Sequence, residues 1–193
     1  MRRELQPSDI KLKWGCKSVG EREEPNFVIE PLGAKHDRAV FSCGNDELDS
    51  YLHKQAAQDL KKRAAVPFVI TPDRKTIAGF YTLSQYAADL GEVPMEVAKR
   101  LPKYPTVSAT LLGRLAVSTE FRGRGLGERL LMDALRRSLQ SSKQVASAGV
   151  VVDAKDISAE EFYKKYGFIE LPRVARRLFL AMGTVEALFG ESK

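Results

Sequence analysis

The sequence predicts an α/β fold in which a mixed central sheet is flanked by helices. Along the 193 residues, β-rich apolar runs alternate with segments whose apolar residues recur at helical spacing. The most apolar run, 108–118, leads directly into a glycine-rich turn and a helix. Such continuous apolar runs are typical of central strands. The resulting order, β α β β α β α β α β, favours one sheet with helices packed around it.

The composition is that of a globular protein, with 44% hydrophobic and 29% charged residues. A formal net charge of +6 favours anionic partners such as phosphates, nucleic acid or an acidic protein. The two cysteines, Cys16 and Cys43, show neither a metal-ligand spacing nor a disulfide framework, so we expect no metal and a cytoplasmic setting. No apolar run approaches the roughly 18 residues that a membrane span needs.

The chain divides into an N-terminal arm, 1–26, and one domain, 27–193. The arm is polar, mixed in charge and poorly periodic, a composition typical of flexible segments, and it lacks the apolar stretch of a secretory signal. A short strand is expected at 26–32. The segment 43–65 then predicts a helix capped by Gly44-Asn45. Its expected buried stripe is Leu48, Leu52, Ala56 and Leu60.

The middle of the chain predicts a hairpin, a short helix and the central strand. The hairpin strands are 66–71 and 76–87, on either side of a Pro-Asp-Arg-Lys turn. Prolines bracket the short helix within 91–105, and the strand 108–118 follows. The next helix has a buried face of Leu126, Leu130, Leu131, Ala134, Leu135 and Leu139.

The C-terminal part predicts a strand at 146–154, a short helix and a last strand at 176–182. The short helix is expected to begin at Ser158, with Glu161 three residues later as a capping box, and to end at Gly167.

The turn before the long helix has the composition of an anion site. The first amides of a helix lack intrahelical partners, and glycines let an anion approach them closely. No Gly-Lys-Ser/Thr follows, which excludes a Walker loop, and Glu128 stands where the dinucleotide pattern needs its third glycine. A glycine turn used only for strand–helix packing is the alternative.

Three motifs in the right order resemble the GNAT family of N-acetyltransferases. Residues 122–127 fit R/Q-x-x-G-x-G/A, and the preceding "LLGRLAV" is similar to the family's central strand. Downstream, "DISAEEFYKKYGF" resembles N-x-x-A-x-x-x-Y-x-x-x-G-F, although Asp156 replaces the usual Asn. An ionised Asp cannot donate a hydrogen bond as an amide does, so we assign Asp156 no cofactor role. The resemblance covers roughly residues 27–182.

The resemblance implies acetyl-CoA as the acetyl donor and names the residues that hold it. Tyr163 is implied as the acid that protonates the leaving thiolate, and Tyr166 is expected to serve packing. Arg122 and Arg124 add positive charge, or are solvated surface arginines. The implied cofactor-binding residues are Leu115, Ala116, Val117, Arg122, Gly123, Arg124, Gly125, Leu126 and Gly127.

A general base is not evident. The two histidines, His36 and His53, adjoin no cofactor motif, and the central strand carries Arg114 rather than a glutamate. A lysine acceptor, with a pKa of about 10.4, needs such a base, whereas an α-amine with a pKa of about 8 does not. Arg114 therefore favours an anionic acceptor; a salt-bridging arginine is the alternative.

Within the family, "FSCGNDELDSYLHKQAAQDLKKRAAVPFVI" and "LPKYPTVSATLLGRLAVS" resemble toxins of type II toxin–antitoxin pairs. This resemblance implies acetylation of the α-amine of aminoacyl-tRNA, inhibition of translation and a ribbon-helix-helix antitoxin as partner; a homodimer is a further expectation. The alternatives are a housekeeping enzyme for a small amine or protein N-terminus, and a non-catalytic acetyl-CoA-binding regulator. Basic clusters that could contact tRNA phosphates are Lys61-Lys62-Arg63, Arg74-Lys75, Lys99-Arg100, Arg136-Arg137 and Arg173 with Arg176-Arg177.

Overall fold

A computed structural model describes residues 26–89, 91, 93, 98–99, 103–171 and 173–190. Its centre is a sheet with the strand order β1-β2-β3-β4-β5-β7-β6. Strands β4 and β5 pair in parallel, and every other neighbouring pair is antiparallel. The predicted mixed sheet with flanking helices is confirmed.

The observed strands match the predicted ones, with one addition. Strand β6 was not predicted because two residues are too short to show an alternating pattern. The strands are β1 Val28–Pro31, β2 Val66–Thr71, β3 Gly79–Asp89, β4 Thr106–Val117, β5 Gly149–Asp153, β6 Ile169–Glu170 and β7 Arg177–Ala181.

The helices depart from the prediction at two places, besides the start of α5 described below. The segment 43–65 forms three consecutive helical pieces rather than one helix, and a helix, α6, follows the strand that was expected to close the chain. The helical elements are α1 Asp46–Ser50, the π-helix η2 Tyr51–Gln55, α2 Ala56–Lys62, the 3₁₀-helix η3 Thr119–Phe121, α4 Leu126–Ser142, α5 Ile157–Lys164 and α6 Met182–Leu188.

The π-helix changes which residues of this region are buried. Asn45 caps α1 as predicted, and its side chain accepts a hydrogen bond from the Leu48 N–H at 3.0 Å. The wider turn of η2 then shifts the helical phase. As a result Leu52 is fully buried together with Tyr51, whereas Leu48 and Leu60, both predicted in the stripe, are only half-buried.

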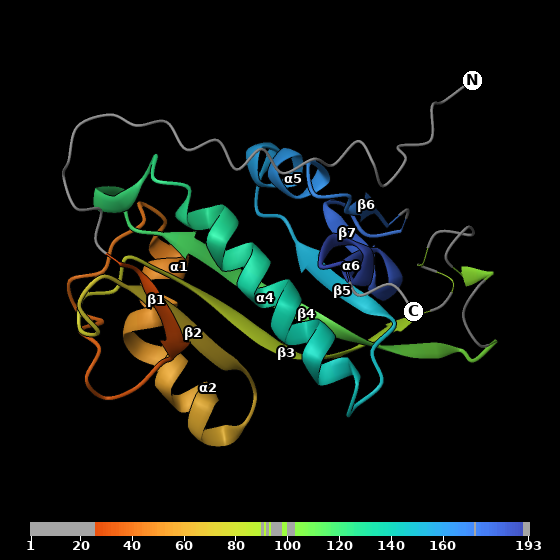
Figure 1. Cartoon of the computed structure of the whole chain (residues 1–193), viewed down its shortest axis with the longest axis horizontal. Coiled ribbons are helices and arrows are strands. Elements are labelled where there is room, and N and C mark those ends of the chain that lie inside the picture. Colours follow the sequence, from red (N-terminus) through yellow and green to blue (C-terminus); the bar gives the residue numbers. More distant parts are fainter. Residues whose placement is uncertain are drawn as a thin grey trace.

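The sheet is covered on both faces. Helix α4 lies across β3 and β4, with α5 and α6 beside it toward β5 and β7 (Figure 1). All six apolar residues predicted for its inner face are buried in a core shared with α5 and α6. On the opposite face, residues of η2 and α2 pack on Val69, Phe80 and Ala116. The cleft described below opens between these layers.

Helix α5 begins earlier than predicted. Asp156, in an extended conformation, is the N-cap, and its carboxylate accepts a hydrogen bond from the Ala159 N–H at 2.8 Å. Ser158 already lies inside the first turn, so the predicted capping box of Ser158 and Glu161 is wrong. The carboxylate of Asp156 competes successfully because it lies three residues before an unpaired amide. After the helix ends, Gly167 takes a positive φ of 85°.

Two predictions fall largely outside the described residues: the arm, of which only Asn26 is described, and the short helix within 91–105. Among the residues that the structure describes, no helix is both long enough and apolar enough to cross a membrane.

Candidate active site

A bulge in β4 lies at the centre of the site. Arg114 is opposite Thr82 on β3, whereas Leu112 is opposite Leu83, so Gly113 is an extra residue in β4. The parallel pairing of β4 with β5 ends at Leu112. Beyond it, in the described chain, no strand pairs with that edge of β4. Its backbone groups are therefore available to a ligand.

The glycine turn presents free amides next to this open edge. Gly123 and Gly125 have φ angles of 76° and 71°, which favour glycine, and a Cβ on either would meet nothing within 4 Å. Gly125 is the N-cap of α4 without a side-chain cap, and the Arg129 N–H donates to its carbonyl at 3.2 Å. The amides of 126–128 precede this first helical bond and point to a position where an anion would be stabilised.

Gly127 lies where β4 approaches α5. A Cβ at this position would be 3.9 Å from both Val117 Cγ2 and Phe162 Cζ, an ordinary contact. Of the three strand residues predicted to contact the cofactor, Ala116 is buried against the α2 side, while Leu115 and Val117 are half-buried on the α4 side. The turn and the strand predicted from the motifs are thus adjacent in space.

The two arginines of the turn have protein partners. The guanidinium of Arg122 donates a hydrogen bond to the backbone carbonyl of Cys43 and lies beside Gly44. Arg124 lies over the ring of Phe121 at 5.4 Å and is exposed. The Arg122 contact spans 79 positions and has no local signal in the sequence.

A cleft of about 670 Å³ runs between the α1 side and α5. It brings together Leu115, Arg114 and Tyr163, which the sequence analysis had singled out, with residues of α1 and η2 that it had not. The glycine turn itself is not among the lining residues. These are Asn45, Glu47, Leu48, Ser50, Tyr51, Gln55, Leu111, Gly113, Arg114, Leu115, Asp153, Ala154, Lys155, Ala159 and Tyr163.

Tyr163 is the buried phenol of this cleft. Its side chain packs edge-on against Phe162 and beside Phe168, and burial raises the pKa of its hydroxyl well above the usual 10. Within the described chain no group hydrogen bonds this hydroxyl. Tyr166 instead contacts Phe162, and burial together with the Glu128 carboxylate raises its pKa. Tyr163 therefore presents a protonated, unengaged hydroxyl to the cleft.

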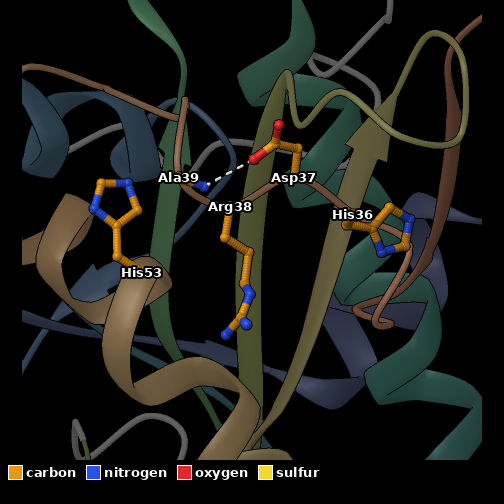
Figure 2. Close-up of a pocket in the computed structure, with 5 residues that line it drawn as sticks. All are labelled: His36, Asp37, Arg38, Ala39 and His53. Atoms are coloured by element: carbon orange, nitrogen blue, oxygen red, sulfur yellow. Dashed lines mark hydrogen bonds between the residues drawn. The ribbon is translucent and has the colours of Figure 1, made fainter.

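Neither histidine lines the cleft. Both border a second hollow, of about 380 Å³, where Figure 2 shows their rings pointing away from one another. His36 accepts the Gly33 N–H and donates to Glu30, and His53 donates to the carbonyl of Phe41 at 2.8 Å. The absence of a histidine base from the cleft agrees with the sequence analysis.

The acidic side chains in the cleft differ in their engagement. Asp153 receives two hydrogen bonds from Arg177, at 2.7 and 3.1 Å, and Arg177 also donates to the Tyr86 hydroxyl. Glu47 lies on the exposed first turn of α1.

Arg114 lies over the ring of Tyr51, with 3.6 Å between its Cζ and the ring centroid. No salt bridge of Arg114 occurs among the residues described, so the salt-bridging alternative is not seen there.

An open strand edge and a phenol held in its protonated form lie at one cleft, and a helix start without a side-chain cap adjoins that strand edge. This arrangement suits a transferase that handles an anionic acyl donor. The family described as "Acetyltransferase (GNAT) domain" matches residues 105–178. The chain is 30% identical over 172 residues to "Probable toxin TacT" of Sinorhizobium fredii, covering 84% of this chain and 95% of the relative. It is 33% identical over 155 residues to the "tRNA-acetylating toxin" of Mycobacterium tuberculosis, covering 80% and 92%.

The chain therefore belongs to the GNAT family of acetyltransferases, as the motifs predicted. Solved structures agree. AtaT complexed with acetyl-methionyl-tRNAfMet has a TM-score of 0.78 and 27% identity, over 85% of this chain and 99% of that one. A mutant AtaT toxin bound to the C-terminus of the antitoxin AtaR and acetyl-CoA has a TM-score of 0.72 and 25% identity, over 84% and 98%.

Proposed function

We propose that this protein transfers the acetyl group of acetyl-CoA to the α-amine of aminoacyl-tRNA and thereby blocks translation, as the toxin of a type II toxin–antitoxin pair. The observation that carries the proposal is the cleft itself, which joins the acid Tyr163 to the cation Arg114 and has no histidine base. The relatives support it, since they include a tRNA-acetylating toxin and a structure with acetylated tRNA.

The residues fit acetyl-CoA, which supplies an acetyl group activated as a thioester. The amides at the start of α4 and the clear space at Gly123 and Gly125 suit its diphosphate. The free edge of β4 from Gly113 to Val117 suits an amide-containing arm, because both are hydrogen-bonding backbones. Arg124, exposed beside the turn, adds a mobile positive charge.

The chain's own groups then divide the chemistry. Backbone N–H groups at the bulged edge of β4 stabilise negative charge on the acetyl oxygen as the bond to the amine forms. Tyr163 donates its proton to the departing sulfur as the carbon–sulfur bond breaks, and the resulting phenolate is reprotonated by the proton that the attacking nitrogen loses when the amide forms. A phenol whose pKa is raised by burial stays protonated at neutral pH and becomes ionised only as it transfers that proton.

The acceptor must arrive as a neutral amine because the cleft offers no evident base. The α-amine of an esterified amino acid has a pKa of about 8 or below, so a large fraction is neutral at pH 7.5. A lysine side chain, with a pKa of about 10.4, would be neutral in only about 0.1% of molecules. This difference favours aminoacyl-tRNA over lysine-bearing proteins.

The protein partner in this proposal is a ribbon-helix-helix antitoxin. AtaT, a structural neighbour, is bound to the C-terminus of its antitoxin AtaR, and the toxin-like stretches of this chain support the same kind of partner. A homodimer is part of the same proposal, and sedimentation of the purified chain with and without the antitoxin tests it.

The experiment is transfer of labelled acetyl from acetyl-CoA to purified charged tRNA, uncharged tRNA, free amino acids and a lysine peptide. We expect label on charged tRNA only, with release of acetylated amino acid after mild base. Label on the lysine peptide but not on charged tRNA would support the housekeeping enzyme. Acetyl-CoA binding without transfer to any amine would support the regulator.

A further inference from the structure

Arg114 faces the side of the sheet opposite α4 because of the bulge in β4. On this strand Leu112, Leu115 and Val117 belong to the core beneath α4, whereas Ala116 belongs to the core beneath α2. In a regular strand Arg114, two positions after Leu112, would lie on the same face as Leu112; because Gly113 is an extra residue, Arg114 is opposite Thr82 and lies on the face of Ala116 instead. The bulge therefore turns this arginine into the cleft, toward η2.

The π-helix supplies the surface on which Arg114 rests. Tyr51 and Gln55 are its first and last residues, and both line the cleft. The Tyr51 hydroxyl donates to the Asp59 carboxylate at 3.0 Å, which fixes the ring, and the Arg114 guanidinium lies over that ring. Two local irregularities in different elements thus meet in a single stacked pair. Both π-helices and bulges are frequent where a site needs a side chain aimed.

The stacked guanidinium retains its hydrogen-bonding capacity. In the described part of the chain, neither a hydrogen bond nor an ion pair uses any of its five donors, and stacking engages its face rather than its edge. An arginine held this way presents a planar fork of donors that matches phosphate or carboxylate oxygens in two places at once. It also lies across the sheet from α4, whose N-terminus is proposed to hold the donor's diphosphate.

We propose that Arg114, positioned by Tyr51, contacts an oxyanion of the acceptor and so determines acceptor specificity. This inference rests on the proposed function. The shared chemistry is an oxyanion beside the aminoacyl ester, supplied either by a phosphodiester at the 3′ end of the tRNA or by the carboxylate of an acidic aminoacyl group.

The test compares acceptors that differ in that oxyanion. The wild type, Arg114→Gln, Arg114→Lys and Tyr51→Phe are assayed on charged tRNA, an aminoacyl-CpA dinucleotide with one phosphodiester and an aminoacyl-adenosine with none. The two small acceptors carry either a neutral or an acidic amino acid. Arg136→Gln is the matched control on the two small acceptors, because Arg136 also lies over an aromatic ring, that of Phe189, but outside the cleft. It is not used as a control on charged tRNA, because the Arg136-Arg137 cluster is itself a candidate for phosphate contacts.

For a phosphodiester contact, we expect Arg114→Gln to raise KM for the dinucleotide about 10- to 100-fold, as for loss of a hydrogen bond to a charged group. KM for the neutral aminoacyl-adenosine and for acetyl-CoA should not change. Arg114→Lys should raise this KM less than Arg114→Gln does, because lysine keeps the charge but lacks the planar fork of donors. The KM of Tyr51→Phe should lie between those of Arg114→Lys and the wild type. For a carboxylate contact, the variant instead loses a preference for acidic aminoacyl groups.

Equal KM changes on acceptors with and without an oxyanion would overturn the inference, because a purely structural role predicts them. An unchanged KM on every acceptor would overturn it as well. If Arg114→Gln fails to fold, as judged by acetyl-CoA binding, the Arg114→Lys comparison decides alone. Failure of the proposed function gives a different result, in which the wild type leaves charged tRNA unlabelled; the inference then falls with it.

Discussion

The side chain of Arg122 donates a hydrogen bond to the backbone carbonyl of Cys43, so the glycine turn is tied to the loop in front of α1. A second hydrogen bond joins the same two segments, because the Thr119 N–H donates to the Ser42 carbonyl at 2.9 Å. The Cys43 N–H in turn donates to the Asp49 carboxylate in α1. The proposed donor site and the α1 wall of the cleft are therefore one connected unit.

Replacing Arg122 should loosen this connection. We expect Arg122→Ala to lower the free energy of unfolding by about 1 kcal/mol, the typical net value of one hydrogen bond, because the bond is partly buried but the arginine side chain is exposed. Acetyl transfer should decline as well, because α1 lines the cleft. Arg124→Ala is the matched control. Its free energy of unfolding, measured by thermal unfolding, should lie within about 0.5 kcal/mol of the wild-type value. Equal stability of the two variants would contradict a structural role for Arg122.

The glycines of the turn should respond differently to one methyl group. Gly125 has a φ of 71°, so Gly125→Ala should cost about 1 kcal/mol in strain and lower the Tm by about 2–4 °C. Gly127 lies inside α4 with ordinary contacts around its Cβ position, so Gly127→Ala should be neutral or stabilising. Differential scanning calorimetry of both variants tests whether Gly125→Ala has the lower Tm. An equal or higher Tm for Gly125→Ala would contradict the positive φ of Gly125.

Most of the fold followed from the sequence because apolar periodicity reports burial directly. The six-residue face of α4 and the run 108–118 were predicted on this basis. The π-helix Tyr51–Gln55 was missed because its flanking residues keep the spacing of an ordinary helix. The cap of α5 was misassigned because Ser158 and Asp156 are both good caps, and only the backbone conformation distinguishes them.

Tyr163→Phe should separate catalysis from folding. In the described structure no protein group hydrogen bonds the hydroxyl, so its removal leaves no partner unsatisfied, and we expect stability and acetyl-CoA affinity to stay unchanged. Turnover should fall about 10²- to 10⁴-fold, the usual contribution of general-acid catalysis. Tyr166→Phe, three residues away on the same helix end, is the control. A larger loss of turnover in that variant would transfer the role to Tyr166.

The pH profile of the wild type should rise and then stay level. Below about pH 8 the rate increases with pH, because the acceptor α-amine must lose its proton before it attacks. A decline on the alkaline side requires ionisation of Tyr163, and burial raises the pKa of this phenol, which displaces the decline to higher pH. We therefore expect kcat/KM for charged tRNA to show no decline up to pH 9.5. A bell with a maximum near pH 7.5 would indicate a different acid.

The site was predictable where motifs are local and unpredictable where the fold joins distant segments. The turn 122–127 and Tyr163 belong to short sequence motifs. The Arg114–Tyr51 pair depends instead on a bulge and a π-helix, and the spacing of residues in the sequence predicts neither. Net charge was a poor guide to individual arginines. Arg137 is bound to Asp133 and lies over Phe68, and Arg177 is bound to Asp153. Both had been considered for tRNA contacts, yet both have partners within the fold.

A second cation of the cleft, Lys155, is also placed for the tRNA backbone, and its replacement should affect salt dependence rather than stability. Lys155 lines the cleft and is half-exposed, with Asp156 at 3.6 Å, an ion pair too exposed to contribute much. If it neutralises one phosphate, Lys155→Gln should make the slope of log(kcat/KM) against log[salt] shallower by about 1, measured at subsaturating charged tRNA. Arg177→Gln is the contrasting variant. It breaks a double hydrogen bond to Asp153 and another to Tyr86, so it should lower the Tm and reduce activity without changing that slope. An unchanged slope in Lys155→Gln would show that Lys155 contacts no phosphate of the tRNA.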